Sequence, residues 1–153
     1  MNATLNQSNL LASISTPNLE ANKQLVLRHF NEVINQKRLD VISQIFAEEF
    51  YSVAPTGAIG SGRTNLSNYL GYFFTAFPDL HMTVQEMLAE NDTVVALVNV
   101  TATHQGEFWG IPATQNVINI QEVFIVKVID NWVVEARPQP DLYALFKQLN
   151  ANK

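Results

Sequence analysis

Two ionisable side chains occur where strand alternation otherwise predicts apolar ones. Between residues 94 and 104, every second residue is Val or Ala until His104 ends the series, and Glu122 interrupts a similar series between residues 118 and 128. A carboxyl group among aliphatic side chains resists ionisation, and a nearby imidazolium favours it. Either effect would adjust Glu122 for proton transfer near neutral pH. We therefore predict Glu122 and His104 as catalytic acid–base residues.

Two structural interpretations of Glu122 remain open at this point. Its carboxylate could pair with a basic side chain, since perturbed carboxylates also occur in structural networks. Alternatively, a β-bulge could turn the side chain toward solvent. The position of Glu122 relative to a cavity decides between these interpretations and a catalytic role.

The loop that follows His104 is unusually apolar. Gly106, Gly110 and Pro112 mark residues 103–112 as a connection between two strands, yet the segment carries Phe108, Trp109 and Ile111. Loops are normally polar and exposed, so this one is expected to cover an apolar space. A titratable group beside an aromatic rim suggests the mouth of a ligand pocket.

Other side chains are candidates for substrate binding, as pocket walls, hydroxyl donors or charged anchors: Tyr51, Tyr69, Phe73, Trp109, Arg137 and Asp141. Arg137 could hold a substrate carboxylate or enolate, or it could neutralise Glu135 or Glu122. Asp141 could line the pocket, or it could lie at the start of a helix, where the dipole stabilises an acid whatever the function.

The periodicity of the chain predicts helices first and an antiparallel sheet afterwards. Apolar residues recur at helical spacing within residues 19–37, 39–50, 63–76 and 142–149, with Thr16 as the expected N-cap of the first helix and Pro140 as the start of the last. Alternation indicates strands over residues 81–89, 93–103, 116–129 and 132–137. This order describes an α+β fold in which a curved antiparallel sheet wraps around the N-terminal helices and encloses a pocket.

Composition restricts the class of protein. The 153 residues correspond to one domain, which we place at residues 19–150 after a mobile N-terminal arm of residues 1–18. A net charge of -5 and scattered basic residues argue against nucleic acid as a partner. No apolar run is long enough to span a membrane, and the N-terminus lacks the basic residues of a signal peptide, so we expect a cytoplasmic protein. The chain has no cysteine, and its three histidines have no metal-ligand spacing, so we expect no metal.

The run Thr103-His104-Gln105-Gly106-Glu107-Phe108, followed by Gly110-Ile111-Pro112, resembles the SnoaL-like polyketide cyclase (ester cyclase) family. The segment Ala76-Phe77-Pro78-Asp79-Leu80 is similar to that family as well. The resemblance implies an NTF2-like cone, and intramolecular aldol ring closure without metal or organic cofactor. It also implies that His104 is the loop histidine of the family and that an acid on the third strand of the sheet removes a proton. Many relatives carry an Asp about where Phe124 or its neighbours fall, and this sequence offers Glu122 instead.

Three functions follow as hypotheses. The first is a cofactor-independent cyclase or isomerase acting on a small hydrophobic carbonyl compound, with Glu122 as base and His104 as its partner. The second is a non-catalytic module that binds a small ligand, and the third is an epoxide or ester hydrolase that uses Glu122, Glu135 and Asp141 together. A homodimer is predicted from the apolar residues on the outer sheet face, which are Val95, Leu97, Val123 and Ile125.

Overall fold

The computed structural model describes residues 18–53 and 59–150, so the predicted N-terminal arm lies almost wholly outside the described residues. The helical segments are α2 (Leu19–Arg28), the π-helix η1 (His29–Asn35), the 3-10 helix η2 (Leu39–Val41), α3 (Ile42–Ile45), α4 (Arg63–Ala76) and α5 (Leu142–Leu149). The strands are β1 (Phe46–Val53), β2 (Ile59–Ser61), β3 (His81–Glu90), β4 (Thr93–Thr103), β5 (Val117–Ile129) and β6 (Trp132–Pro140).

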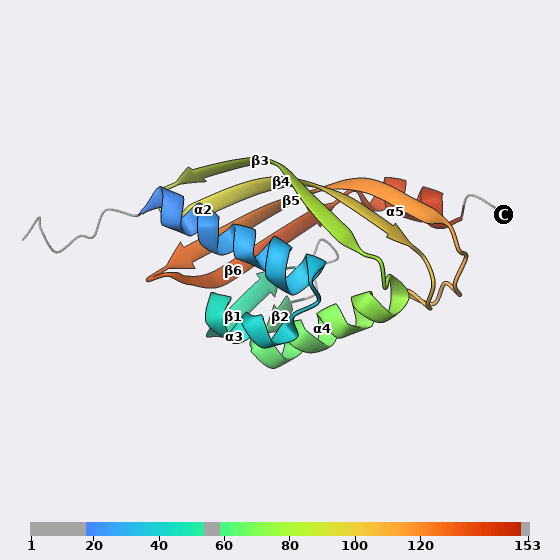
Figure 1. Ribbon diagram of the computed structural model, residues 1–153, viewed down its shortest axis with the longest axis horizontal. Coiled ribbons are helices and arrows are strands. Elements are labelled where there is room, and N and C mark those ends of the chain that lie inside the picture. The colour runs from blue at the N-terminus through green and yellow to red at the C-terminus, as the bar shows by residue number, and fades with distance from the viewer. Residues whose placement is uncertain (1–17, 54–58, 151–153) are drawn as a thin grey trace, which may run out of the picture.

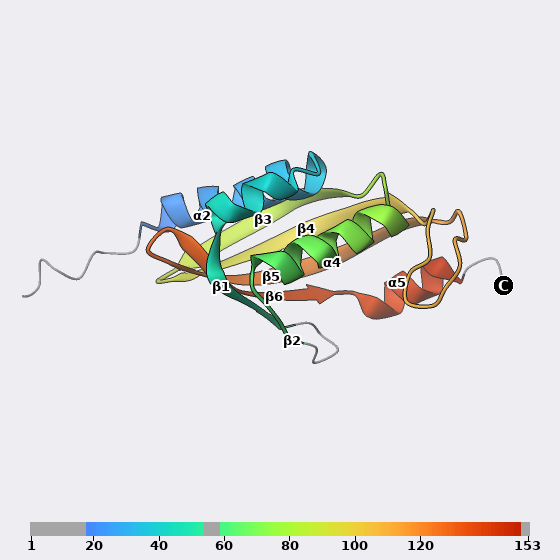
Figure 2. The same cartoon turned by 90° about the horizontal axis from the view of Figure 1, so that it is seen from below.

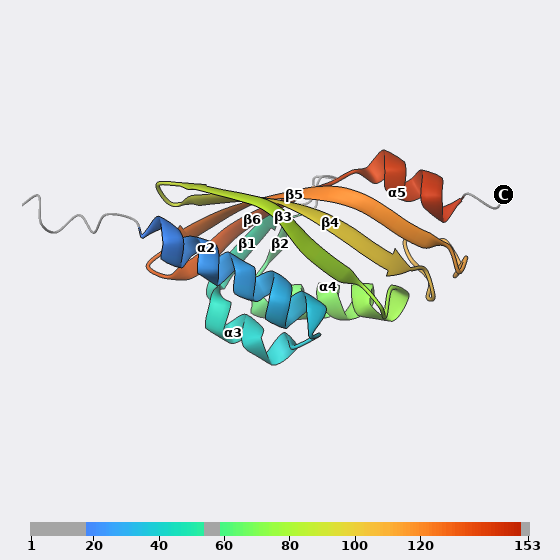
Figure 3. The same cartoon turned by 45° about the horizontal axis from the view of Figure 1, so that its top comes forward.

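All six strands belong to one curved sheet with the order β2-β1-β6-β5-β4-β3. The predicted antiparallel meander is confirmed for β3 to β6, and β1 adds to it by pairing in parallel with β6. Helices α2, α3 and α4 lie together on one side of the strands, whereas α5 follows β6 at the other end of the molecule (Figures 1 and 3). The predicted α+β architecture is therefore correct, with a mixed sheet in place of a purely antiparallel one.

The core lies between the concave face of the sheet and these helices. In β4, alternate residues from Val94 to Ala102 are at most 4% exposed, and in β5 the series from Ile118 to Val128 is at most 9% exposed. The two series pair across the strands, so that Val98 faces Glu122. Strand alternation thus brings both predicted apolar faces, with Glu122 among them, into the interior.

The helix boundaries follow local signals. Asn18 caps α2 through a hydrogen bond from the Ala21 backbone N–H to its side chain (3.0 Å), so the prediction of Thr16 as the N-cap of this helix is wrong by two residues. Helix α4 has the predicted bounds and runs along the inner side of the sheet (Figure 2). Pro140 ends β6 and does not begin the last helix, which starts after Asp141.

Candidate functional site

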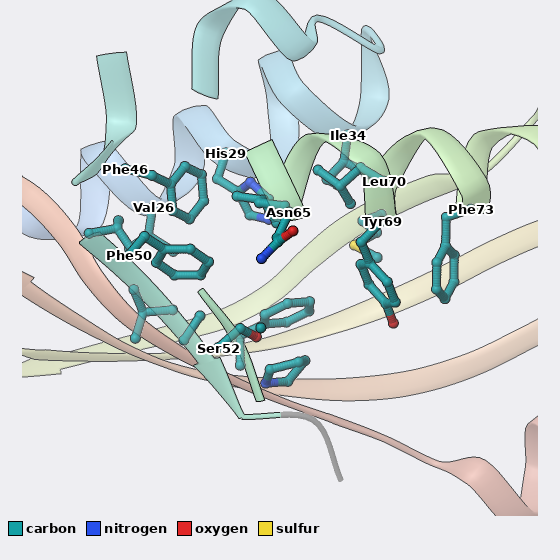
Figure 4. Close-up of a pocket in the computed structure, with 18 of the residues that line it drawn as sticks. Val26, His29, Ile34, Phe46, Phe50, Ser52, Asn65, Tyr69, Leu70 and Phe73 are labelled. Atoms are coloured by element: carbon teal, nitrogen blue, oxygen red, sulfur yellow. The ribbon is translucent and has the colours of Figure 1, made fainter. Parts of the chain in front are cut away.

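A cavity of about 420 Å³ lies between the sheet and helices α2, η1 and α4. Its wall is mainly aliphatic and aromatic, and Phe46, Phe50, Tyr69 and Phe73 point into the space from several elements (Figure 4). The polar side chains of the wall are few: His29, Ser52, Asn65, Tyr69 and Glu122. A largely apolar chamber with a small number of polar groups is the usual form of a small-molecule site.

Glu122 lies on the floor of this cavity because it occupies an inward position of β5. It is 9% exposed, and no residue in the described ranges forms a hydrogen bond or an ion pair with its carboxyl group. Burial raises the pKa of Glu122 to about 8. The register irregularity between β5 and β6 falls at Lys127 and Val128, beyond this position. Both alternative interpretations, a paired carboxylate and a solvent-facing one, are therefore contradicted.

Tyr69 projects into the same cavity from α4. Although 48% of the residue is accessible, its hydroxyl points into the cavity (Figure 4). Burial, together with the nearby charge of Glu122, raises the pKa of Tyr69 to about 12. The phenol consequently remains protonated at physiological pH and can donate a hydrogen bond.

His29 is a cavity residue that sequence reasoning missed. It follows Val26 by one helical turn and lines the cavity, where burial lowers its pKa to about 4. The ring contacts Phe46 at 5.1 Å and Phe30 at 5.2 Å between centroids. The available signal was this spacing, which places His29 on the inward side of the first helix.

A smaller cavity of about 70 Å³ adjoins the large one near α5 and the loop of residues 104–112. Tyr69, Phe73 and Glu122 line both spaces, whereas Trp109 lines only the small one. Glu122 and Tyr69 therefore stand at the junction of a large chamber and a small annex.

His104 is fully buried, but it lines neither cavity. Its Nδ1 lies 3.0 Å from Thr114 Oγ1 and accepts a hydrogen bond from the Thr114 backbone N–H (3.3 Å). Its backbone bonds to Gln115 and Asn116, and its ring packs 5.3 Å from the Phe77 ring. Burial lowers the pKa of His104. These contacts hold the start of the loop in place.

The loop covers the annex through a stack of aromatic rings, as its composition suggested. Trp109 stacks on Phe108 (4.5 Å between centroids) and lies 5.8 Å from Phe146 of α5. Its backbone N–H donates to the Tyr72 hydroxyl (2.7 Å). Gly106 passes so close to α4 that a Cβ would lie 2.6 Å from the Thr75 carbonyl oxygen, which explains a glycine at this position.

Three predicted binding residues lie outside both cavities. Tyr51 alternates with the cavity residues Phe50 and Ser52, so it is on the other side of β1. Arg137 forms an ion pair with Glu135 (2.5 Å), and Asp141 caps α5 by accepting a hydrogen bond from the Ala144 backbone N–H (2.9 Å).

These positions bear on the hydrolase hypothesis, which needs three acids around one water molecule. Glu122 lies inside the cavity, Glu135 pairs with Arg137, and Asp141 caps a helix. The three carboxyl groups do not share a site, so the arrangement does not support a hydrolase that uses them together.

Among residues 18–53 and 59–150, no group of three or more His, Asp or Glu side chains could hold a metal ion. In the same part of the chain, no helix is long and apolar enough to cross a membrane.

A family model for the SnoaL-like polyketide cyclases matches residues 24–149, which is most of the chain. The protein belongs to the SnoaL-like polyketide cyclase family. No curated protein matches the sequence. Among solved structures, the SnoaL-like domain is similar to a protein from Jannaschia sp. CCS1 that is provisionally described as a SnoaL-like polyketide cyclase. The two share 25% identity and a TM-score of 0.84, over 90% of this chain and 97% of that one.

Two Streptomyces proteins are also similar. AclR from Streptomyces galilaeus, provisionally described as a hydroxylase, has 26% identity and a TM-score of 0.77, over 87% of this chain and 83% of its own. IdmH from Streptomyces antibioticus, provisionally described as a polyketide cyclase, has 20% identity and a TM-score of 0.74, over 84% of this chain and 97% of its own. The predicted NTF2-like α+β cone is thus confirmed.

Proposed function

We propose that this SnoaL-like protein binds a small hydrophobic carbonyl compound and removes a proton next to its carbonyl group, with Glu122 as the base. The observation that carries the proposal is the Glu122 carboxyl at the junction of the two cavities, where it pairs with no residue in the described part of the chain. Membership of the family supports a cyclase- or isomerase-like ligand-binding role.

The proposed reaction is an intramolecular aldol addition. Ionised Glu122 takes a proton from the carbon next to the carbonyl, and the electron pair of that C–H bond forms an enolate. The enolate carbon then attacks a second carbonyl carbon of the same molecule, which forms the new C–C bond and leaves an alkoxide. Protonated Glu122 returns the proton to this alkoxide, so the reaction consumes no co-reactant.

Other side chains have supporting roles in this proposal. The Tyr69 hydroxyl donates a hydrogen bond to the enolate oxygen, where a fixed donor stabilises the developing charge. Phe73 supplies apolar wall to both cavities, and Trp109 supplies apolar wall to the small one. His104 acts as a positioning residue, because it holds the loop that carries Trp109.

A non-catalytic binding module is the second candidate, and one observation favours it. With a pKa of about 8, Glu122 is mostly protonated at pH 7 and acts there mainly as a hydrogen-bond donor. A cavity that offers donors in an apolar wall would retain a carbonyl ligand without transforming it.

Proton exchange on 2-tetralone in D2O distinguishes the two functions, since it needs abstraction next to the carbonyl but no ring closure. We expect the wild-type protein to accelerate exchange, as followed by ¹H NMR, and Glu122→Gln to slow it by about 100-fold. Asp141→Asn, which retains an oxygen for the helix cap, is the matched control and should exchange at the wild-type rate.

Equal exchange rates in wild type and Glu122→Gln would overturn the role of Glu122 as base. If 2-tetralone binds but its exchange is not accelerated at any pH between 6 and 9, the binding module is the better description.

A further inference from the structure

His29 provides a second polar group, at the end of the large cavity away from Tyr69. In the close-up, His29 lies with Phe46 and Phe50 on one side, whereas Tyr69 and Phe73 lie on the other (Figure 4). The lining of the small cavity separates the same residues: Tyr69 and Phe73 line it, whereas His29 does not. The reaction proposed for Glu122 makes no use of this imidazole.

No described residue uses the hydrogen-bonding capacity of this imidazole. The Nδ1 atom is buried without a partner, and neither ring nitrogen forms a hydrogen bond with any residue in the described part of the chain. A neutral imidazole has one donor and one acceptor nitrogen. His29 lines the large cavity, so the unused hydrogen-bonding capacity of its ring is available to a ligand there.

The surroundings hold the ring in a defined orientation. Phe46 approaches it edge-on at 85° between planes, and Phe124 does so at 66°. His29 is also the first residue of the seven-residue π-helix His29–Asn35. Because π-helical turns are uncommon and are frequent at functional sites, this local widening supports a ligand-binding role.

We propose that His29 binds an oxygen atom of the ligand at the end of the cavity remote from Glu122. The ligand class that fits both ends is an uncharged compound with an aromatic body and two oxygen functions, one near Tyr69 and Glu122 and one hydroxyl or ketone oxygen at His29. The aromatic body lies among the phenylalanine rings between them. This inference rests on the proposed function only in taking the large cavity as the ligand site.

Two related probes test the inference by isothermal titration calorimetry. 2,6-Dihydroxynaphthalene has hydroxyl groups at both ends, whereas 2-naphthol has one. The wild-type protein should bind the dihydroxy compound about tenfold more tightly, which is the effect expected of one buried hydrogen bond to an otherwise unpaired group. His29→Phe keeps an aromatic ring at this position and should abolish the preference, whereas His29→Gln should keep part of it.

His81→Phe is the matched control, because His81 is an exposed histidine of β3 that should leave the preference unchanged. The inference is overturned if His29→Phe, shown to be folded by circular dichroism, keeps the wild-type preference. If His29→Phe does not fold, the inference is overturned when His29→Gln keeps the full wild-type preference. It is also overturned if the wild-type protein does not bind the dihydroxy probe or binds both probes equally. Because the readout is a ratio of dissociation constants, it is independent of whether Glu122 catalyses proton exchange.

Discussion

Glu122 and Tyr69 face the same two cavities from opposite layers of the fold, Glu122 from the sheet and Tyr69 from helix α4. Enclosure raises both pKa values, to about 8 for the carboxyl and about 12 for the phenol. The carboxyl can therefore gain or lose a proton near physiological pH, whereas the phenol remains a donor. One group suited to proton transfer beside one fixed donor is the arrangement that enolate formation needs.

Removal of the Tyr69 hydroxyl should impair the reaction more than the binding. We expect Tyr69→Phe to slow 2-tetralone exchange by about 100-fold, the usual effect of losing one donor to a developing oxyanion. Tyr72→Phe is the matched control, since the Tyr72 hydroxyl bonds to the loop at Trp109 and does not line either cavity. An unchanged exchange rate in Tyr69→Phe would remove Tyr69 from the mechanism.

The orientation of Glu122 could be predicted from the sequence. A strand with one buried face can be placed in only two ways, which differ in which set of alternate side chains points inward. Ten other buried, alternating positions in β4 and β5 left one choice for Glu122. Arg137 shows the limit of the same reasoning. Alternation correctly grouped it with Glu135, but which face of β6 looks inward depends on pairing with distant strands, and Ala136 and Pro138 are the residues that line the cavity.

His29 and the parallel pairing of β1 with β6 escaped prediction for a related reason. Both depend on contacts between segments about 90 residues apart, such as that of His29 with Phe124 or of Tyr51 with Glu135. The histidine signal was also ambiguous, since a lone histidine on an apolar helix face is compatible with a packing role. Local patterns therefore predicted the strands β3 to β6 and their faces, but they placed residues 46–50 in a helix where the structure has β1. The composition of the cavity also required the tertiary structure.

The free energy of unfolding should depend on pH through Glu122. Burial raises the pKa of this carboxyl from 4.5 to about 8, so between these values the folded protein retains a proton that the unfolded chain releases. Stability contributed by the protonated group is complete below pH 4.5 and is lost as the pH rises toward 8.

Urea unfolding of wild type and Glu122→Gln at several pH values measures this effect. Between about pH 5 and pH 8, the free energy of unfolding of the wild-type protein should fall by on the order of 3 kcal/mol relative to that of the variant. Titration of His29 affects both proteins and cancels in the difference. Glu86→Gln, at an exposed position of β3, should follow the wild-type pH dependence. Parallel curves for wild type and Glu122→Gln would contradict a raised pKa.

Gly106 should tolerate no side chain. A Cβ there would lie 2.6 Å from the Thr75 carbonyl oxygen and 3.0 Å from the Ala76 Cα, so the loop or the end of α4 would have to move. We expect Gly106→Ala to lower the free energy of unfolding by about 1–3 kcal/mol, as for other overpacked sites. Gly71→Ala is the control and should have the opposite effect. Because Gly71 lies within α4 with open space around it, this substitution should raise the free energy of unfolding by about 0.5–1 kcal/mol.

Asp141 should prove to be a structural residue. Its side chain accepts a hydrogen bond from the Ala144 backbone N–H at the start of α5. Asp141→Ala should therefore lower the free energy of unfolding, measured by thermal unfolding, by about 0.5–2 kcal/mol. Asp141→Ser should recover most of this loss. Both variants should bind 2-naphthol with the wild-type dissociation constant, and a large selective loss of binding would instead place Asp141 in the ligand site.

The outer face of the sheet supports our proposal of a homodimer. Leu88, Val95 and Ile125 form one row across β3, β4 and β5, and Leu88 and Ile125 are 63% and 39% exposed. The basic side chains beside this row pair within the protomer, Lys127 with Asp92 (3.9 Å) and Arg137 with Glu135 (2.5 Å). A two-fold axis near the centre of the face would bring the apolar rows of the two protomers together.

Light scattering after size-exclusion chromatography tests this association. The wild-type protein should elute as a dimer at high micromolar concentration, and Ile125→Glu should be monomeric because it introduces a charge into the apolar row. Leu19→Glu is a matched control, since Leu19 is also 39% exposed but lies on α2, which packs on the inner side of the sheet. A dimer that persists in Ile125→Glu would place the interface elsewhere, and a monomeric wild-type protein would contradict the proposal.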